Sequence, residues 1–180
     1  VDDLLDVSRI IRGNIELRRE PVDLSVVISR AVETAQPVLD AHGHELTVSL
    51  PEPPLAVDAD PIRMAQVIAN LLTNAAKYTD KAGRIVLTVE REAEDAIIRV
   101  RDTGIGISAE FLPHVFDLFA QGDRSLARSQ GGLGIGLTLV RRLVEMHGGT
   151  VRAATEGENR GSEFTVRLPA LPQERAWEVA

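Results

Sequence analysis

The stretch QGGLGIGLTLV (residues 130–140) places three glycines immediately before an apolar run with helical character: Gly132, Gly134 and Gly136. Glycines directly before a helix are typical of a phosphate-binding turn, because the first backbone amides of the helix point at the anion. The motif therefore predicts that the protein holds a phosphate compound, and the rest of the chain has to identify it.

Two common phosphate-binding turns do not fit this stretch. A P-loop has Lys followed by Ser or Thr after its last glycine, whereas Leu137 and Thr138 stand here. A dinucleotide-binding turn follows a buried strand, whereas residues 121–130 are polar and basic. A different kind of nucleotide site is therefore expected.

The composition predicts one compact domain, since 180 residues with 44% hydrophobic content can bury one substantial core. A net charge of -7 without a Lys/Arg cluster argues against nucleic acid or a membrane surface as a partner. The absence of cysteine excludes disulfides and thiolate metal sites, which fits a cytoplasmic location. No apolar run reaches membrane-spanning length. The chain begins inside a helical pattern, which predicts that it is part of a longer protein.

Hydrophobic periodicity predicts alternating helices and strands. Asp60 followed by Pro61 marks a helix start, because the aspartate caps the helix and proline fits its first turn. The expected elements are helices over residues 1–17, 24–41, from 61, 108–116 and 137–146, and strands over 44–50, within 51–60, and over 84–90, 96–102, 150–154 and 162–169. This order predicts an α+β fold, a two-layer α/β sandwich with helices covering one face of a mixed, mostly antiparallel sheet.

The connecting segments are read from their composition. Residues 18–24 (RREPVDL) are expected to form a connector, because the residue before Pro21 favours extended backbone. Residues 120–132 have little apolar content and are expected to form a lid-like loop. The tail over residues 170–180 is expected to be disordered.

The helix that begins at Pro61 has two distinct faces. One is an apolar stripe that includes Met64, Ile68 and Leu72. Polar residues follow helical spacing on the other: Asn70, Asn74, Lys77 and Tyr78. The apolar stripe predicts the core side of the helix and leaves the polar face for solvent or for a ligand.

Several motifs in fixed order resemble those of one family. They are NLLTNAAKYT (70–79), DTGIGI (102–107), FDLF (116–119), GGLGIGL (131–137) and the pair Gly161 and Ser162. Together they resemble the N, G1, F, G2 and G3 boxes of the GHKL ATP-binding superfamily, with its Bergerat fold, and most closely the catalytic domain of bacterial sensor histidine kinases. The resemblance covers residues 22–169 and implies that residues 1–21 are the end of a dimerisation helix and its connector.

The resemblance implies a role for each polar residue of the first box. Asn74 would be the Mg²⁺ ligand, for which a neutral amide oxygen is chemically suited, and Asn70 would assist it. Lys77 can reach phosphate as a point charge, and Tyr78 can stack on the base. A merely solvated helix face is the alternative explanation of this pattern.

The second and fifth boxes are expected to bind adenine. A buried Asp102 could accept a hydrogen bond from the exocyclic amine, which guanine replaces with a carbonyl, so the carboxylate favours ATP. Gly104 and Gly106 would let the nucleotide lie close to the backbone. Ser162 would bring a hydroxyl to the adenine pocket through water. An ordinary turn between strand and helix is the alternative.

The glycine run over residues 130–137 is assigned to the β- and γ-phosphates of ATP, at Gly132, Leu133, Gly134, Gly136 and Leu137. Phe119 belongs to the F box with Phe116, although a Phe pair at this spacing is also typical of a core. Arg124 and Arg128 are candidates to neutralise charge on the γ-phosphate when the lid closes, or they are solvated loop residues.

The reaction is predicted from one position. ATP-hydrolysing branches of the superfamily have a Glu one turn before the Mg²⁺ asparagine, whereas this chain has Asn70, which cannot act as a general base. We therefore expect a histidine kinase domain, with Asn74, Lys77 and Arg124 assisting transfer. The resemblance implies that the phosphoryl group passes to a histidine on the dimerisation domain of a homodimeric parent protein, and then to a response-regulator aspartate. An ATP-driven clamp of gyrase or chaperone type and a degenerate nucleotide-binding module are the alternatives.

The histidines carry no further function in this interpretation. His44-Glu45-Leu46 imitates the beginning of the acceptor motif of histidine kinases, but the following residues continue a strand pattern. His42 and His44 lack a third ligand for a metal site and are expected to lie on the surface.

Overall fold

A five-stranded sheet forms the centre of the computed structural model, which describes residues 5, 8–9, 12–13, 15–117, 136–157 and 159–172. The strand order is β2-β4-β5-β7-β6. The strands are β2 (Glu45–Ser49), β4 (Arg84–Glu92), β5 (Asp95–Asp102), β6 (Thr150–Thr155) and β7 (Ser162–Pro169). The pair β2 and β4 is parallel and every other pair is antiparallel, which confirms the expected mixed, mostly antiparallel sheet.

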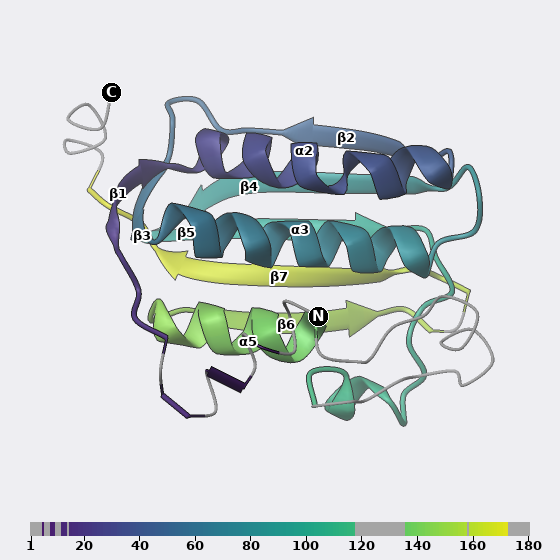
Figure 1. Ribbon diagram of the computed structural model, residues 1–180. Helices are drawn as coiled ribbons and strands as arrows, with labels where there is room; N and C mark the ends of the chain where they lie inside the picture. The colour runs from purple at the N-terminus through teal and green to yellow at the C-terminus, as the bar shows by residue number, and fades with distance from the viewer. Residues whose placement is uncertain are drawn as a thin grey trace.

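Three helices cover one face of this sheet (Figure 1): α2 (Leu24–Ala41), α3 (Pro61–Lys77) and α5 (Gly136–Met146). Periodicity and caps explain them, since Asp23 and Asp60 each accept hydrogen bonds from the first amides of α2 and α3. The apolar stripe of α3 lies fully in the core, with Met64, Ile68 and Leu72 at 0% exposure. The two-layer sandwich is therefore confirmed.

The opposite face of the sheet carries charged side chains because residues alternate between the two faces of a strand. Ile98 and Val100 of β5 are buried under the helices. Arg99, which points the other way, pairs with Glu90 and Glu92 of β4. Such exposed pairs add little stability but keep this face polar. Among the described residues, no helix is long and apolar enough to cross a membrane.

The connector contains a strand that the sequence patterns did not reveal. Strand β1 (Glu20–Asp23) pairs antiparallel with β3 (Ala56–Ala59), so it crosses the expected boundary at residue 22. Its signal is weak because it is four residues long and contains a proline, yet Val22 is buried. Just beyond β7, the backbone amide of Leu171 donates to Ala56, so the chain is still paired where the tail was expected to begin.

Two expected helices are shorter in the structure. Residues 15–19 have no regular structure, although the first helix was expected to reach residue 17. The helix expected over residues 108–116 is the single 3-10 turn η1 (Leu112–His114). Ser108 does accept a hydrogen bond from the amide of Phe111, but Pro113 has no backbone N–H with which to continue an α-helical ladder.

A cluster around the buried residues Asp60 and His147 joins the connector to the ends of two helices. Asp60 caps α3, accepts a hydrogen bond from the amide of Arg18, and donates its own amide to Nε2 of His147 (3.1 Å). Nδ1 of His147 donates to the carbonyl of Leu143 in α5 (2.7 Å). Arg19 binds the carbonyl of Met146. The beginning of α3 and the end of α5 are thereby held together, and the imidazole is neutral because one nitrogen must accept.

Burial lowers the pKa of His147, so this cluster makes folding depend on pH. As pH falls below the ordinary histidine pKa, about 6.5, the unfolded chain takes up a proton at His147 that the folded chain resists. The free energy of unfolding should therefore fall between pH 7.5 and pH 5.5, by more in the native protein than in His147→Gln, whose amide offers one acceptor and one donor but does not titrate.

Urea unfolding at the two pH values measures this difference. At pH 7.5, His147→Ala should lose about 1–3 kcal/mol, because the amide of Asp60 is left buried without an acceptor. An equal pH dependence in the native protein and His147→Gln would contradict the role given to the imidazole.

Candidate nucleotide-binding site

The C-terminal end of α3 meets the turn after β5 at one end of the sheet, where the amide of Ile105 donates to the carbonyl of Tyr78. Figure 1 shows the end of α3 beside this end of the sheet. Asn74, Lys77 and Tyr78 are half-buried in the last turn of α3, while their neighbours Ala75 and Ala76 are in the core. Asp102 ends β5 at the same end, directly opposite Ser162, the first residue of β7. Three segments that are distant in the sequence thus converge, as the motifs predicted.

Asp102 is the most constrained polar group of the site, with an exposure of 4%. Its Oδ1 accepts from the backbone amides of Gly104 (2.9 Å) and Ser162 (3.2 Å), and its Oδ2 accepts from the hydroxyl of Ser162 (2.8 Å). Burial raises the pKa of Asp102, and these hydrogen bonds act in the opposite direction. Three converging donors orient a carboxylate whose second oxygen still has a lone pair for a ligand.

The glycines of the two turns are required by close approach of the protein backbone. A Cβ on Gly104 would lie 2.2 Å from the carbonyl oxygen of Tyr78. Gly106 and Gly161 both have φ of +74°, and a Cβ there would lie 2.1 Å from the carbonyl oxygens of Gly157 and Asp102. The close approach of the nucleotide to Gly104 and Gly106, expected from the sequence, stays a prediction.

The two glycine turns form one unit. The amide of Gly161 donates to Gly104 (3.0 Å). Thr155 lies between them: its hydroxyl donates to the carbonyl of Gly161 (2.9 Å) and accepts from the amides of Ile107 and Gly157. Sequence reasoning missed Thr155, because a threonine in an edge strand has no pattern that reveals such contacts.

His44 also has a structural role that its sequence context does not reveal. Its Nε2 donates to the carbonyl of Ala76 (2.9 Å), and its Nδ1 accepts from the amide of Gly83 (3.1 Å). It therefore holds the end of α3 against the start of β4 and is not a free surface residue. Among the described residues, no cluster of three or more His, Cys, Asp or Glu could hold a metal ion.

The described residues fit a nucleotide. Two buried polar atoms beside the site have no hydrogen-bond partner among them, Nδ2 of Asn70 and Oγ1 of Thr79. Unsatisfied buried groups are rare and often mark where a ligand or ordered water binds. Because carboxylates do not cluster here, a Mg²⁺ ion would have to use the amide oxygen of Asn74 together with phosphate and water oxygens.

Part of the expected phosphate-binding end of the site lies within the described residues. Gly136 and Leu137 begin α5, and because the end of α5 is bonded to the start of α3, its N-terminus lies toward the same end of the molecule as Tyr78. This orientation directs the positive end of the helix dipole at the expected phosphates. The remaining predicted residues, Phe119, Arg124, Arg128, Gly132, Leu133 and Gly134, lie outside the described residues, and their roles stay predictions.

The F box is anchored to α5 through Phe116. Its carbonyl accepts from the hydroxyl of Thr138 (2.8 Å), and its ring meets Phe164 edge to face with centroids 6.0 Å apart. Phe116 is therefore partly core, as expected.

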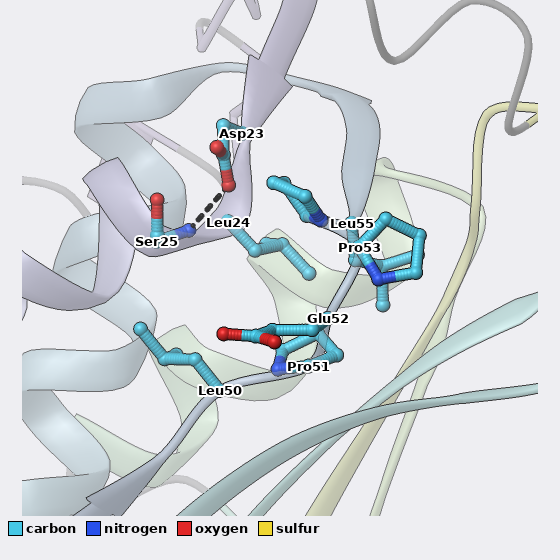
Figure 2. Close-up of a pocket in the computed structure, with 9 residues that line it drawn as sticks. Asp23, Leu24, Ser25, Leu50, Pro51, Glu52, Pro53 and Leu55 are labelled. Atoms are coloured by element: carbon cyan, nitrogen blue, oxygen red, sulfur yellow. Dashed lines mark hydrogen bonds between the residues drawn. The ribbon is translucent and has the colours of Figure 1, made fainter.

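A separate cavity of about 450 Å³ lies between the start of α2 and the β2–β3 loop. Figure 2 shows its lining of leucines and prolines, with Asp23 accepting from the amide of Ser25 as the cap of α2. None of the predicted site residues that the structure describes lines it. Its lining includes Asp23, which ends β1, and Leu55, which directly precedes β3, so it lies at the start of α2 and not at the end of α3.

Comparison with known families agrees with this geometry. Residues 59–172 match the family described as histidine kinase-, DNA gyrase B- and HSP90-like ATPase. The chain belongs to this family. It is an ATP-binding catalytic domain of the sensor histidine kinase type. The chain is 39% identical over 173 residues to the circadian input-output histidine kinase CikA of Synechococcus elongatus, and the match covers 94% of this chain and 22% of that protein. It is 37% identical to the sensor histidine kinase RcsC of Escherichia coli, covering 94% and 18%.

Solved structures have the same fold as this kinase domain. The mycobacterial sensor histidine kinase MprB superposes with a TM-score of 0.75 and 30% identity, covering 86% of this chain and all of that one. Full-length ShkA in complex with AMPPNP gives 0.80 at 29% identity, covering 94% and 35%. The kinase domain spans about a fifth of the curated relatives named above, at 22% and 18% of their lengths.

Gly104→Ala tests whether the site depends on the close packing of the turn at Gly104 against the end of α3. The new Cβ would meet the backbone carbonyl of Tyr78 at 2.2 Å, so the turn must shift. We expect a loss of about 1–3 kcal/mol in the free energy of unfolding. ATP affinity should fall at least about tenfold, because the amide of residue 104 moves away from Asp102.

Chemical denaturation and calorimetric ATP titration measure the two effects. Gly136→Ala is the stability control, since nothing lies within 4 Å of a Cβ at that glycine. Native stability together with native ATP affinity in Gly104→Ala would contradict the described geometry.

Proposed function

We propose that this domain binds Mg-ATP and transfers the γ-phosphoryl group to a histidine on the dimerisation domain of its parent protein, for relay to an aspartate of a response-regulator receiver domain. The observation that carries the proposal is Asn70, one helical turn before Asn74 on the polar face of α3. An amide cannot take a proton from water, so hydrolysis lacks a general base at this position. The phosphoryl group is then left for another nucleophile.

The side chains around Asn70 have the chemistry that nucleotide binding requires. Asn74 would contribute its amide oxygen to a Mg²⁺ ion, and the ion, when bound, neutralises charge on the phosphates. Lys77 would contact phosphate. Asp102 would accept from the exocyclic amine of adenine. Burial raises the pKa of Tyr78, so its ring is a neutral surface for the base.

Transfer to a separate domain is compatible with phosphoryl chemistry, because catalysis depends on positioning and charge neutralisation more than on covalent steps. The connector supplies an attachment for such positioning. Arg18 and Arg19 bind Asp60 and Met146, at the ends of α3 and α5 that lie away from the nucleotide. Arg124 and the other residues of the glycine-rich lid would complete the phosphate site, and the parent protein would act as a homodimer.

The experiment incubates γ-labelled ATP and Mg²⁺ with this domain and a separately produced dimerisation domain of the same parent protein. We expect acid-labile label on the histidine of that domain and little free phosphate. Asn74→Ala should reduce the label at least about 100-fold, because the metal and its charge neutralisation are lost. Gln36→Ala is the matched control, since Gln36 is an exposed amide on α2 that donates to its neighbour Asp40.

The alternatives give different outcomes in the same experiment. Rapid phosphate release without transfer would contradict the kinase proposal and favour an ATP-driven clamp of gyrase or chaperone type. ATP binding with neither transfer nor release would indicate a degenerate nucleotide-binding module.

A further inference from the structure

Thr79 is a buried hydroxyl beside the nucleotide site that none of the motif assignments uses. Its exposure is 4%, and its Oγ1 has no hydrogen-bond partner among the described residues. Leaving a hydroxyl buried and unpaired is costly, and nearly all such groups in folded proteins are satisfied by protein or by a bound molecule. The unpaired hydroxyl of Thr79 therefore indicates a bound ligand.

The position of Thr79 places this hydroxyl next to Asp102. It follows Tyr78, the residue that ends α3. A Cβ built on Gly104 would lie 2.9 Å from Oγ1 of Thr79 and also 2.9 Å from Oδ1 of Asp102. The two oxygens are therefore separated by no more than twice this distance. A hydroxyl and a carboxylate at this spacing can serve two neighbouring atoms of one ligand.

The other hydrogen-bond donors around Asp102 already have acceptors within the protein. The amides of Gly104 and Ser162 both donate to its Oδ1, and the hydroxyl of Ser162 donates to its Oδ2. The carbonyl of Tyr78 accepts from the amide of Ile105. An ionised carboxylate only accepts, so among these groups the hydroxyl of Thr79 is the donor that remains.

Adenine presents a donor and an acceptor side by side, the exocyclic amine and N1. Asp102 can serve the amine, but N1 requires a donor. We propose that the Thr79 hydroxyl is the hydrogen-bond donor to adenine N1, directly or across one water, and so a specificity-determining residue; this rests on the proposed ATP-binding function. Carboxylate and hydroxyl together then match the edge of adenine.

The test compares ATP with 1-deaza-ATP, in which a C–H group replaces N1. Calorimetric titration of the native protein should give about tenfold weaker binding of 1-deaza-ATP, since one hydrogen bond in the pocket is lost. Thr79→Val removes the hydroxyl at similar size, so it should bind ATP about tenfold more weakly and bind the two nucleotides within about twofold of each other. Thr79→Ser keeps the hydroxyl and should keep the native preference.

Thermal unfolding of each variant checks that it is folded, and the preference of the native protein tests the proposal without any substitution. An equal affinity of the native protein for both nucleotides would overturn the role of Thr79. So would a native preference in Thr79→Val, even if both affinities fell, because Thr79 would then act on structure alone. Failure of the native protein to bind either nucleotide would instead overturn the proposed function itself.

Discussion

The buried carboxylate of Asp102 is the constraint on which the rest of the site depends. A charge removed from water must be compensated by hydrogen bonds, and here two amides and a hydroxyl provide them. Those donors come from two turns that are far apart in sequence, so the carboxylate joins the end of β5 to the start of β7. Satisfying it requires Gly104 and Gly161, where a side chain would collide with the backbone. The group proposed to bind adenine is thus also the group that organises the turns around it.

The helices extend this arrangement through the molecule. The Asp60 and His147 cluster holds the start of α3 to the end of α5, so the two helices run in opposite directions. As a result the C-terminal turn of α3, with Asn74 and Lys77, and the N-terminus of α5 lie toward the same end. The connector contacts the other ends through Arg18 and Arg19. Both helices therefore connect the proposed attachment of the dimerisation domain to the proposed nucleotide site.

Much of this could be predicted from the sequence, because its strongest signals are periodic or local. The apolar stripe of α3, its Asp60 cap and the alternation in β4 and β5 are confirmed by the structure, as is the family. Strand β1 is too short for a periodic signal, and the 3-10 turn follows from the single proline at position 113. Residues whose role depends on partners distant in sequence, such as Thr155 and His147, could not be predicted, since neither residue type indicates what it will contact.

Base recognition by Asp102 is tested most directly by measuring the affinity of this domain for Mg-ATP and for Mg-GTP by calorimetry. At the position where adenine has an amine, guanine has a carbonyl oxygen, which would face the oriented carboxylate of Asp102 without a proton between them. ATP should bind at least about 100-fold more tightly than GTP, because a site built to hydrogen-bond one group strongly rejects an analogue that lacks it. Similar affinities for the two nucleotides would contradict the claim that Asp102 reads the base.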